Sequence, residues 1–241
     1  MKKKDYILFY FPFAGGTSYS VSTWNKIISE DILFIPLDIP GRGKRLDEKY
    51  PSKYSDVVDD FFNIVKQYIE NDNIEYIILG HSLGGYLTYH VCDLIERHNL
   101  KRPKCVILSA AVAINRINEL PLTKRLKDNP NRISALENYI ISVHGIPELV
   151  RNNKKLLSIL TNTLLEDLHL IDTMNCDAFK VITSIPAILF YGLNDELDYK
   201  IISEWKNYFH IIEEKAFEGN HFFILENYEE IITYIQKIFA E

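Results

Sequence analysis

The sequence has little cysteine, no paired cysteine motif and no cluster of metal-ligating side chains. Its three cysteines, Cys92, Cys105 and Cys176, are widely spaced, and no histidines stand at the spacing of a metal site. We therefore expect no metal and no other cofactor. We expect the three thiols to be buried or partly buried in a reducing cytoplasm.

The sequence also lacks long apolar runs and an excess of positive charge. No stretch approaches the ~20 apolar residues that a membrane-spanning helix needs. The net charge of -6 gives a surface that repels phosphate backbones. We expect a soluble, cytoplasmic protein with neither a membrane nor nucleic acid as partner. Its 241 residues, 47% of them hydrophobic, fit one globular domain.

Short continuous apolar runs alternate with amphipathic stretches. Continuous apolarity is typical of strands covered on both faces, and the stretches between them have helical periodicity. This alternation favours an α/β fold, with a mostly parallel central sheet flanked by helices. The expected strands are 6–11, 32–37, 76–79, 105–108 and 187–191, and the expected helices include 57–69, 83–98 and 231–239.

One segment is too long for a normal crossover between strands. Residues 113–185 separate two predicted strands by more than the usual connection, and they contain helical patterns broken by proline and glycine. We interpret this segment as a helical cap, or lid, inserted into the single domain of residues 1–241.

Residues 80–84, Gly-His-Ser-Leu-Gly, follow the predicted strand 76–79 and open the predicted helix 83–98. This is the G-x-S-x-G pattern in the strand-turn-helix context that a nucleophile elbow requires. The turn is so sharp that side chains in place of Gly80 and Gly84 would collide with their neighbours. The pattern predicts an α/β-hydrolase fold with Ser82 as nucleophile.

A serine hydroxyl needs a general base, and in this fold the chain order is serine, acid, histidine. Of seven histidines, only His221 lies in a turn directly before the C-terminal helix. We predict His221 as the base. His81 adjoins Ser82 but faces away from it by elbow geometry, so we expect a packed side chain.

The orienting acid should follow a strand before His221. Asp195, Glu196 and Asp198 follow the strand 187–191, whereas residues 109–113 after the preceding strand include no carboxylate. Asp195 is closest to the strand end, so we predict it as the acid. We expect Glu196 and Asp198 to be solvated surface acids.

The oxyanion formed on attack needs two backbone N–H donors. One should be Leu83, directly after the nucleophile, and the other should come from the loop after the first strand. That loop is residues 11–16, Phe-Pro-Phe-Ala-Gly-Gly. We expect Phe13 to supply the second donor, with Ala14 as the alternative.

With these motifs the sequence resembles the type II thioesterases of non-ribosomal peptide and polyketide synthetases. The resemblance is carried, in family order, by residues 11–16, Pro-Gly-Arg-Gly at 40–43 with Arg45, residues 80–85, Gly-Ile-Pro at 145–147, Gly-Leu-Asn-Asp at 192–195 and Gly-Asn-His-Phe-Phe at 219–223. By this likeness Ser82, Asp195 and His221 match the family triad. One departure is that residues 109–111 read Ser-Ala-Ala where the family often has a Gly-Arg pair.

The resemblance implies hydrolysis of acyl groups from the phosphopantetheine thiol of carrier proteins, which clears mis-primed or stalled chains. Acyl-loaded carrier domains of a synthetase would then be the partners. The triad alone does not separate thioesters from esters, because both react through a tetrahedral intermediate. A small-molecule carboxylesterase or lipase, an acyltransferase and a non-catalytic relative of the fold remain the alternatives.

Overall fold

The structure is a computed structural model that describes residues 4–70, 74–119, 130–142, 152–174 and 180–241. Within these residues, six strands form one fully parallel sheet in the order β2-β1-β3-β4-β5-β6. The strands are β1 (Tyr6–Phe11), β2 (Ile32–Pro36), β3 (Glu75–His81), β4 (Cys105–Ser109), β5 (Ile182–Gly192) and β6 (Phe209–Phe217). The predicted parallel α/β sheet is confirmed.

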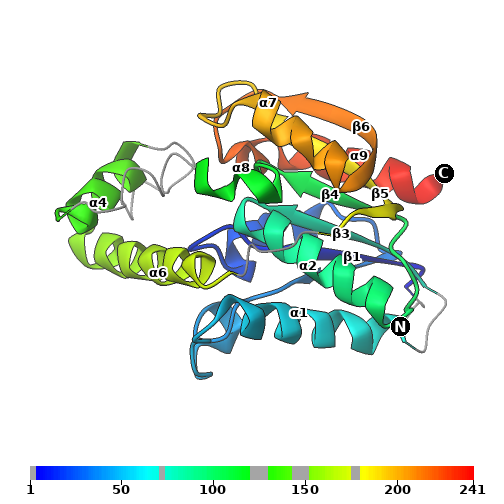
Figure 1. Ribbon diagram of the computed structural model, residues 1–241, viewed down its shortest axis with the longest axis horizontal. Helices are drawn as coiled ribbons and strands as arrows, with labels where there is room; N and C mark the ends of the chain where they lie inside the picture. Colours follow the sequence, from blue (N-terminus) through cyan, green and yellow to red (C-terminus); the bar gives the residue numbers. More distant parts are fainter. Residues whose placement is uncertain (1–3, 71–73, 120–129, 143–151, 175–179) are drawn as a thin grey trace.

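Helices and shorter 3₁₀ turns connect these strands (Figure 1). They are η1 (Ser18–Lys26), η2 (Gly43–Arg45), α1 (Tyr54–Ile69), α2 (Leu83–Arg97), η3 (Ile114–Glu119), α4 (Arg132–Ser142), α6 (Lys154–Asp172), α7 (Tyr199–Ile202), η4 (Ser203–Asn207), α8 (Phe223–Glu226) and α9 (Tyr228–Ala240). The helices that the periodicity predicted therefore exist, and their ends differ from the predicted ones by at most a turn.

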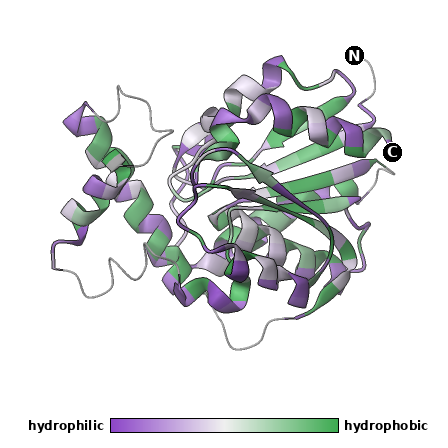
Figure 2. Cartoon of the chain, turned by 90° about the horizontal axis from the view of Figure 1, so that it is seen from above, coloured by the Kyte–Doolittle hydropathy of each residue, from purple (hydrophilic) through white to green (hydrophobic). Residues whose placement is uncertain are grey.

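Both faces of the sheet are covered, which explains the continuous apolar runs. Along β1, Phe9 belongs to a core cluster with buried residues of α1 and α2, whereas Tyr10 belongs to a second cluster with residues of η1 and α9. Successive side chains of a strand point to opposite faces, so a strand between two helical layers must be apolar at every position. Figure 2 shows the apolar strands between the helical layers.

Helices α4 and α6 come from the segment between β4 and β5, and they stand to one side of the sheet (Figures 1 and 2). They share a small apolar cluster of Leu136, Ile140, Leu157 and Leu164. The predicted cap, residues 113–185, stays a prediction as a unit, and β5 already begins at Ile182. Residues 145–147 and Cys176 lie outside the described residues.

The edge strand β6 has no counterpart among the apolar runs of the sequence. Buried and exposed side chains do not alternate regularly along β6, and the residues from His210 to Lys215 are partly or fully exposed. An edge strand pairs on one side only, and charged side chains protect its open side from other chains. The polar composition of β6 therefore fits its place at the edge.

Three expectations about composition can be compared with the described residues. Cys92 and Cys105 are free and buried thiols. Among the described residues, no group of three or more metal-ligating side chains could hold an ion. No described helix is both long and apolar enough to span a membrane.

His90 on α2 is a partly buried histidine that packs between aromatic rings. Its ring lies 5.3 Å from that of Tyr54 and 4.9 Å from that of Tyr89, measured between centroids. No described residue makes a hydrogen bond to its Nε2. Burial lowers the pKa of His90 from 6.5 to about 4, and the nearby Asp93 offsets part of this effect.

This burial predicts a pH-dependent stability. The unfolded chain protonates His90 near pH 6.5 and the folded protein only near pH 4, so the unfolded state binds more protons between these values. The free energy of unfolding should therefore fall as the pH falls. Between pH 6.5 and pH 4.5 we expect the wild type to lose about 2 kcal/mol more than His90→Gln. Urea unfolding of both proteins at the two pH values measures this difference, and equal losses would contradict it.

Candidate active site

Ser82 lies in the tight turn between β3 and α2, with backbone angles of φ 54° and ψ −114°. This left-handed conformation is costly for a residue with a side chain. Glycines make the turn possible: a Cβ atom on Gly80 would lie 2.1 Å from Gly84 O, and one on Gly84 would lie 2.1 Å from Phe11 O. The predicted strand-turn-helix context of residues 80–84 is present.

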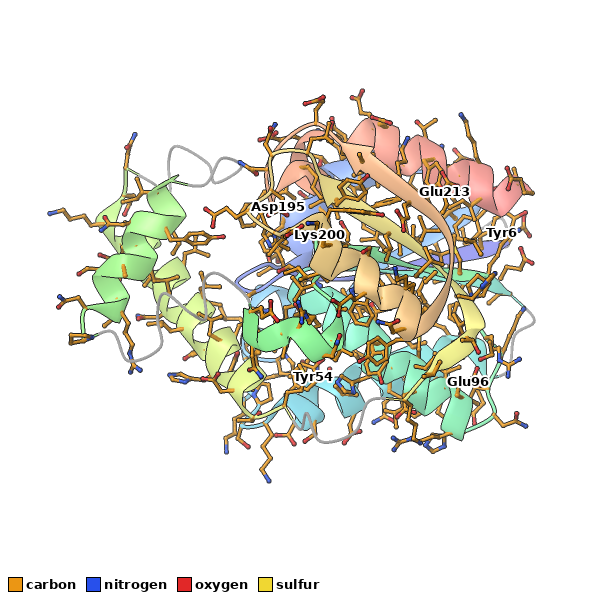
Figure 3. The ribbon with its side chains drawn as sticks, turned by 45° about the horizontal axis from the view of Figure 1, so that its top comes forward. Tyr6, Tyr54, Glu96, Asp195, Lys200 and Glu213 are labelled. Carbon is orange, nitrogen blue, oxygen red and sulfur yellow. The ribbon has the colours of Figure 1, made fainter. Side chains whose placement is uncertain are left out.

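The structure brings Ser82, His221 and Asp195 together, although they are far apart in the sequence. His221 Nε2 lies 3.0 Å from Ser82 Oγ, and His221 Nδ1 lies 2.9 Å from Asp195 Oδ2. The Asp195 side chain is 1% exposed and that of His221 is 17% exposed. Figure 3 shows Asp195 at the end of the sheet body nearer to α4 and α6, whereas Tyr6 and Glu96 lie at the opposite end.

The three acids in the loop after β5, Asp195, Glu196 and Asp198, have different surroundings. Asp195 accepts a hydrogen bond from Leu197 N at 3.2 Å with its other carboxylate oxygen, which fixes the plane of the carboxylate. Asp198 is exposed and caps α7 by accepting from Lys200 N at 2.9 Å. Glu196 is also exposed. Only Asp195 faces the imidazole.

His81 does face away from Ser82, and the structure gives it definite partners. It is fully buried, with Nδ1 2.8 Å from Ser109 Oγ and Nε2 2.9 Å from the backbone oxygen of His221. Burial, and then the neighbouring His221, lowers the pKa of His81 well below 6.5, so the ring is neutral. A neutral ring with Nε2–H donates to His221 O and accepts from Ser109 Oγ. His81 therefore holds the backbone of His221.

The two expected oxyanion donors lie in segments that touch. A Cβ atom on Gly84 would lie only 3.0 Å from Pro12 O, so the start of α2 packs directly against the chain before residues 13–16, here named the oxyanion loop. The Phe13 ring lies 5.8 Å from that of His81 and 5.2 Å from that of Phe222. No described residue accepts a hydrogen bond from the N–H of Phe13, Ala14 or Leu83.

Sequence reasoning missed Asp167 of α6, which is fully buried beside the oxyanion loop. It forms an ion pair with Arg42, whose motif carried the resemblance without an assigned role. A signal was present in the sequence: Asp167 follows Leu157, Leu160 and Leu164 at helical spacing, so an acid stands on the apolar face of an amphipathic helix. Such an acid must find a buried partner.

This arrangement can perform acyl transfer through a covalent serine intermediate. A base within hydrogen-bond reach of a hydroxyl can take its proton, and a buried carboxylate on the other ring nitrogen orients the base and stabilises the imidazolium. The site needs no metal ion for this chemistry.

Comparison with known proteins agrees with this chemistry. A family model described as a thioesterase domain matches residues 6–239. The gramicidin S biosynthesis protein GrsT of Aneurinibacillus migulanus is 25% identical, over 95% of this chain and 87% of GrsT. The human medium-chain S-acyl fatty acid synthase thioesterase is 23% identical, over 94% of this chain and 84% of its own length.

A solved structure shows the same fold. The crystal structure of ClbQ from the colibactin NRPS/PKS pathway superposes with a TM-score of 0.82 at 24% identity, and the match covers 98% of both chains. The resemblance that the motifs indicated is thus confirmed, and so is the α/β-hydrolase fold.

The geometry predicts different outcomes for two identical chemical changes. In Asp195→Asn the amide would face His221 Nδ1 and favour the wrong tautomer, so we expect kcat for thioester hydrolysis to fall roughly 1,000- to 10,000-fold. Asp198→Asn, its matched control, keeps a capping oxygen on α7 and should retain wild-type kcat. Steady-state kinetics with a small acyl thioester checks both variants, and similar kcat values for the two would contradict the assignment.

Proposed function

The chain belongs to the thioesterase domain family and is a hydrolase that acts on thioesters, and we propose that Ser82, His221 and Asp195 are its catalytic triad. We further propose that its substrates are acyl groups on the phosphopantetheine thiol of carrier proteins. The observation that carries the triad is the continuous contact from Ser82 Oγ through the imidazole of His221 to the buried Asp195.

In the acylation step, Ser82 Oγ attacks the thioester carbonyl while His221 Nε2 takes its proton. The N–H groups of Leu83 and of Phe13, with Ala14 as the alternative, stabilise the oxyanion. Asp195 keeps the proton of His221 on Nδ1 and stabilises the imidazolium. The C–S bond then breaks, and the acyl group remains on Ser82 as an ester.

The leaving thiol distinguishes this reaction from ester hydrolysis. A thiol with a pKa of about 8.5 departs as thiolate with little help, so acylation is the easier half. The thiolate then takes up the proton that His221 Nε2 received from Ser82, which gives the free thiol and leaves the imidazole neutral again. In deacylation His221 removes a proton from water, which attacks the acyl-Ser82 ester, and then returns the proton to Ser82 Oγ. The products are a carboxylic acid and the free thiol.

Two observations support an acyl substrate that is bound to a carrier. The similar proteins include GrsT and ClbQ, which their names assign to gramicidin S and colibactin biosynthesis. The described part of the proposed lid, residues 113–185, contains an apolar cluster between α4 and α6 that adjoins Ala14. An apolar wall beside the oxyanion loop suits an acyl chain better than a polar substrate. In this proposal the enzyme clears mis-primed or stalled carriers of a synthetase.

Acyl-loaded carrier proteins test the proposal directly. We expect the wild type to convert acyl-carrier to free-thiol carrier, and Ser82→Ala to do so at least about 1,000-fold more slowly. The exposed Ser22→Ala serves as matched control and should unload carriers at the wild-type rate. Intact mass spectrometry of the carrier measures the rates.

The oxygen ester of the same acyl group separates the alternative functions. Faster hydrolysis of that small ester than of the acyl-carrier would favour a carboxylesterase and contradict the carrier proposal. Unloading by Ser82→Ala at the wild-type rate would contradict the assignment of the nucleophile.

A further inference from the structure

One buried carboxylate connects helix α6 to three loops of the sheet body. Asp167 Oδ2 accepts from Gly15 N at 2.6 Å and from Arg42 Nη1 at 2.5 Å, and its Oδ1 accepts from the Tyr50 hydroxyl at 2.6 Å. These partners lie 117 to 152 residues away in the sequence. Asp167 is fully buried and Arg42 is 6% exposed, so the ion pair between them is shielded from solvent.

The bond to Gly15 acts on the conformation of the oxyanion loop. Gly16 N donates to Phe13 O at 2.8 Å, and Gly15, the third residue of the turn, has a φ of 78°. This is the type II pattern, which differs from type I by a flip of the central peptide. That peptide joins Ala14 to Gly15, and its N–H is the group that Asp167 holds. A flip to type I would turn this N–H away from Asp167, so the hydrogen bond is specific to the type II turn.

The same helix covers the loop with apolar side chains. A Cβ atom on Gly15 would lie 3.2 Å from Leu160 Cδ1 and 3.9 Å from Leu164 Cβ, so the Gly15 backbone packs closely on α6. Ala14 packs against the apolar cluster shared by α4 and α6. Two independent contacts therefore join the oxyanion loop to α6: a backbone hydrogen bond to the carboxylate of Asp167 and apolar packing.

We infer that Asp167 is a positioning residue for the oxyanion hole, so that the seating of α6 on the sheet body sets the direction of the loop's N–H donors. The inference rests on the proposed oxyanion hole at Phe13, or Ala14, and Leu83. Preorganised donors stabilise an oxyanion only when they are aimed at it before the reaction. Without Asp167 the central peptide can flip, because glycine tolerates both turn types. The flip changes ψ of Ala14, so the preceding peptides, which carry the N–H groups of Phe13 and Ala14, lose their fixed direction.

Asp167→Asn tests this inference with a small acyl-pantetheine thioester, which needs no carrier protein. We expect kcat/KM to fall about 10- to 100-fold, less than for the full loss of an oxyanion donor. The neighbouring acid offers a matched control, because Glu166 is exposed on the same helix and Glu166→Gln should behave as wild type.

Two inhibitors of the same acyl length separate positioning from a simple wall of the pocket. A trifluoromethyl ketone forms an oxyanion when Ser82 adds to it, and its inhibition constant should rise by the same factor as kcat/KM falls. A thioether with CH2 in place of the carbonyl forms no oxyanion, and its affinity should change less than about twofold. If the thioether weakens as much as the ketone, or if the ketone affinity does not change, the inference is wrong.

Removing one charge leaves Arg42 buried without its partner, which can destabilise the fold. Arg42→Gln/Asp167→Asn leaves no unpaired charge, and we expect the same difference between ketone and thioether. Ser82→Ala identifies failures of the proposed function. If that variant keeps activity, the proposed nucleophile is wrong, whereas an inactive Ser82→Ala with wild-type behaviour of both Asp167 variants would overturn only the role of Asp167.

Discussion

The left-handed backbone at Ser82 is the constraint on which the site depends. A residue with a side chain in this sparsely populated backbone region costs about 1–3 kcal/mol, so its surroundings must hold it there. They do so from both neighbouring strands: Ser82 N donates to Ser109 O at 2.7 Å, and Gly84 sits against Phe11 O. Ala110 at the end of β4 is also left-handed, with a φ of 47°. The ends of β1, β3 and β4 thus form one rigid platform beneath the serine.

The backbone of His221 is held from this platform, and its imidazole is held by Asp195. His81 belongs to the platform, and its ring bridges Ser109 Oγ and the backbone oxygen of His221. Asp195, from the end of β5, holds the other side of the imidazole. The histidine that adjoins the nucleophile in sequence therefore acts in structure on the histidine that lies 139 residues after Ser82. Parallel strands make this possible, because their carboxyl ends meet at one edge.

The sequence predicted those parts of the structure that depend on neighbouring residues along the chain. Buried strands and the elbow at Ser82 follow from continuous apolarity and from glycine spacing, and Asp195 follows from its nearness to a strand end. Strand β6 was missed because His210 and the charged residues 213–215 interrupt its apolar residues, whereas the other edge strand, β2, is a continuous apolar run. The pairing of Asp167 with Arg42 could not be predicted. An acid on the apolar face of a helix indicates that a buried partner exists, but the helix sequence does not show which residue it is. The partner lies 125 residues away in the sequence, and only the folded chain brings the two side chains together.

The place of Asp167 fits the energetics of the proposed reaction. Since a thiolate leaves readily, an enzyme for thioesters gains little from an acid that protonates the leaving group. Its barriers lie in the formation of the two oxyanions, one in acylation and one in the hydrolysis of the acyl-serine ester. Both oxyanions use the same backbone donors. In this proposal, α6 adjoins the apolar cluster that would bind the acyl chain and also fixes those donors, so one helix acts on both steps at once.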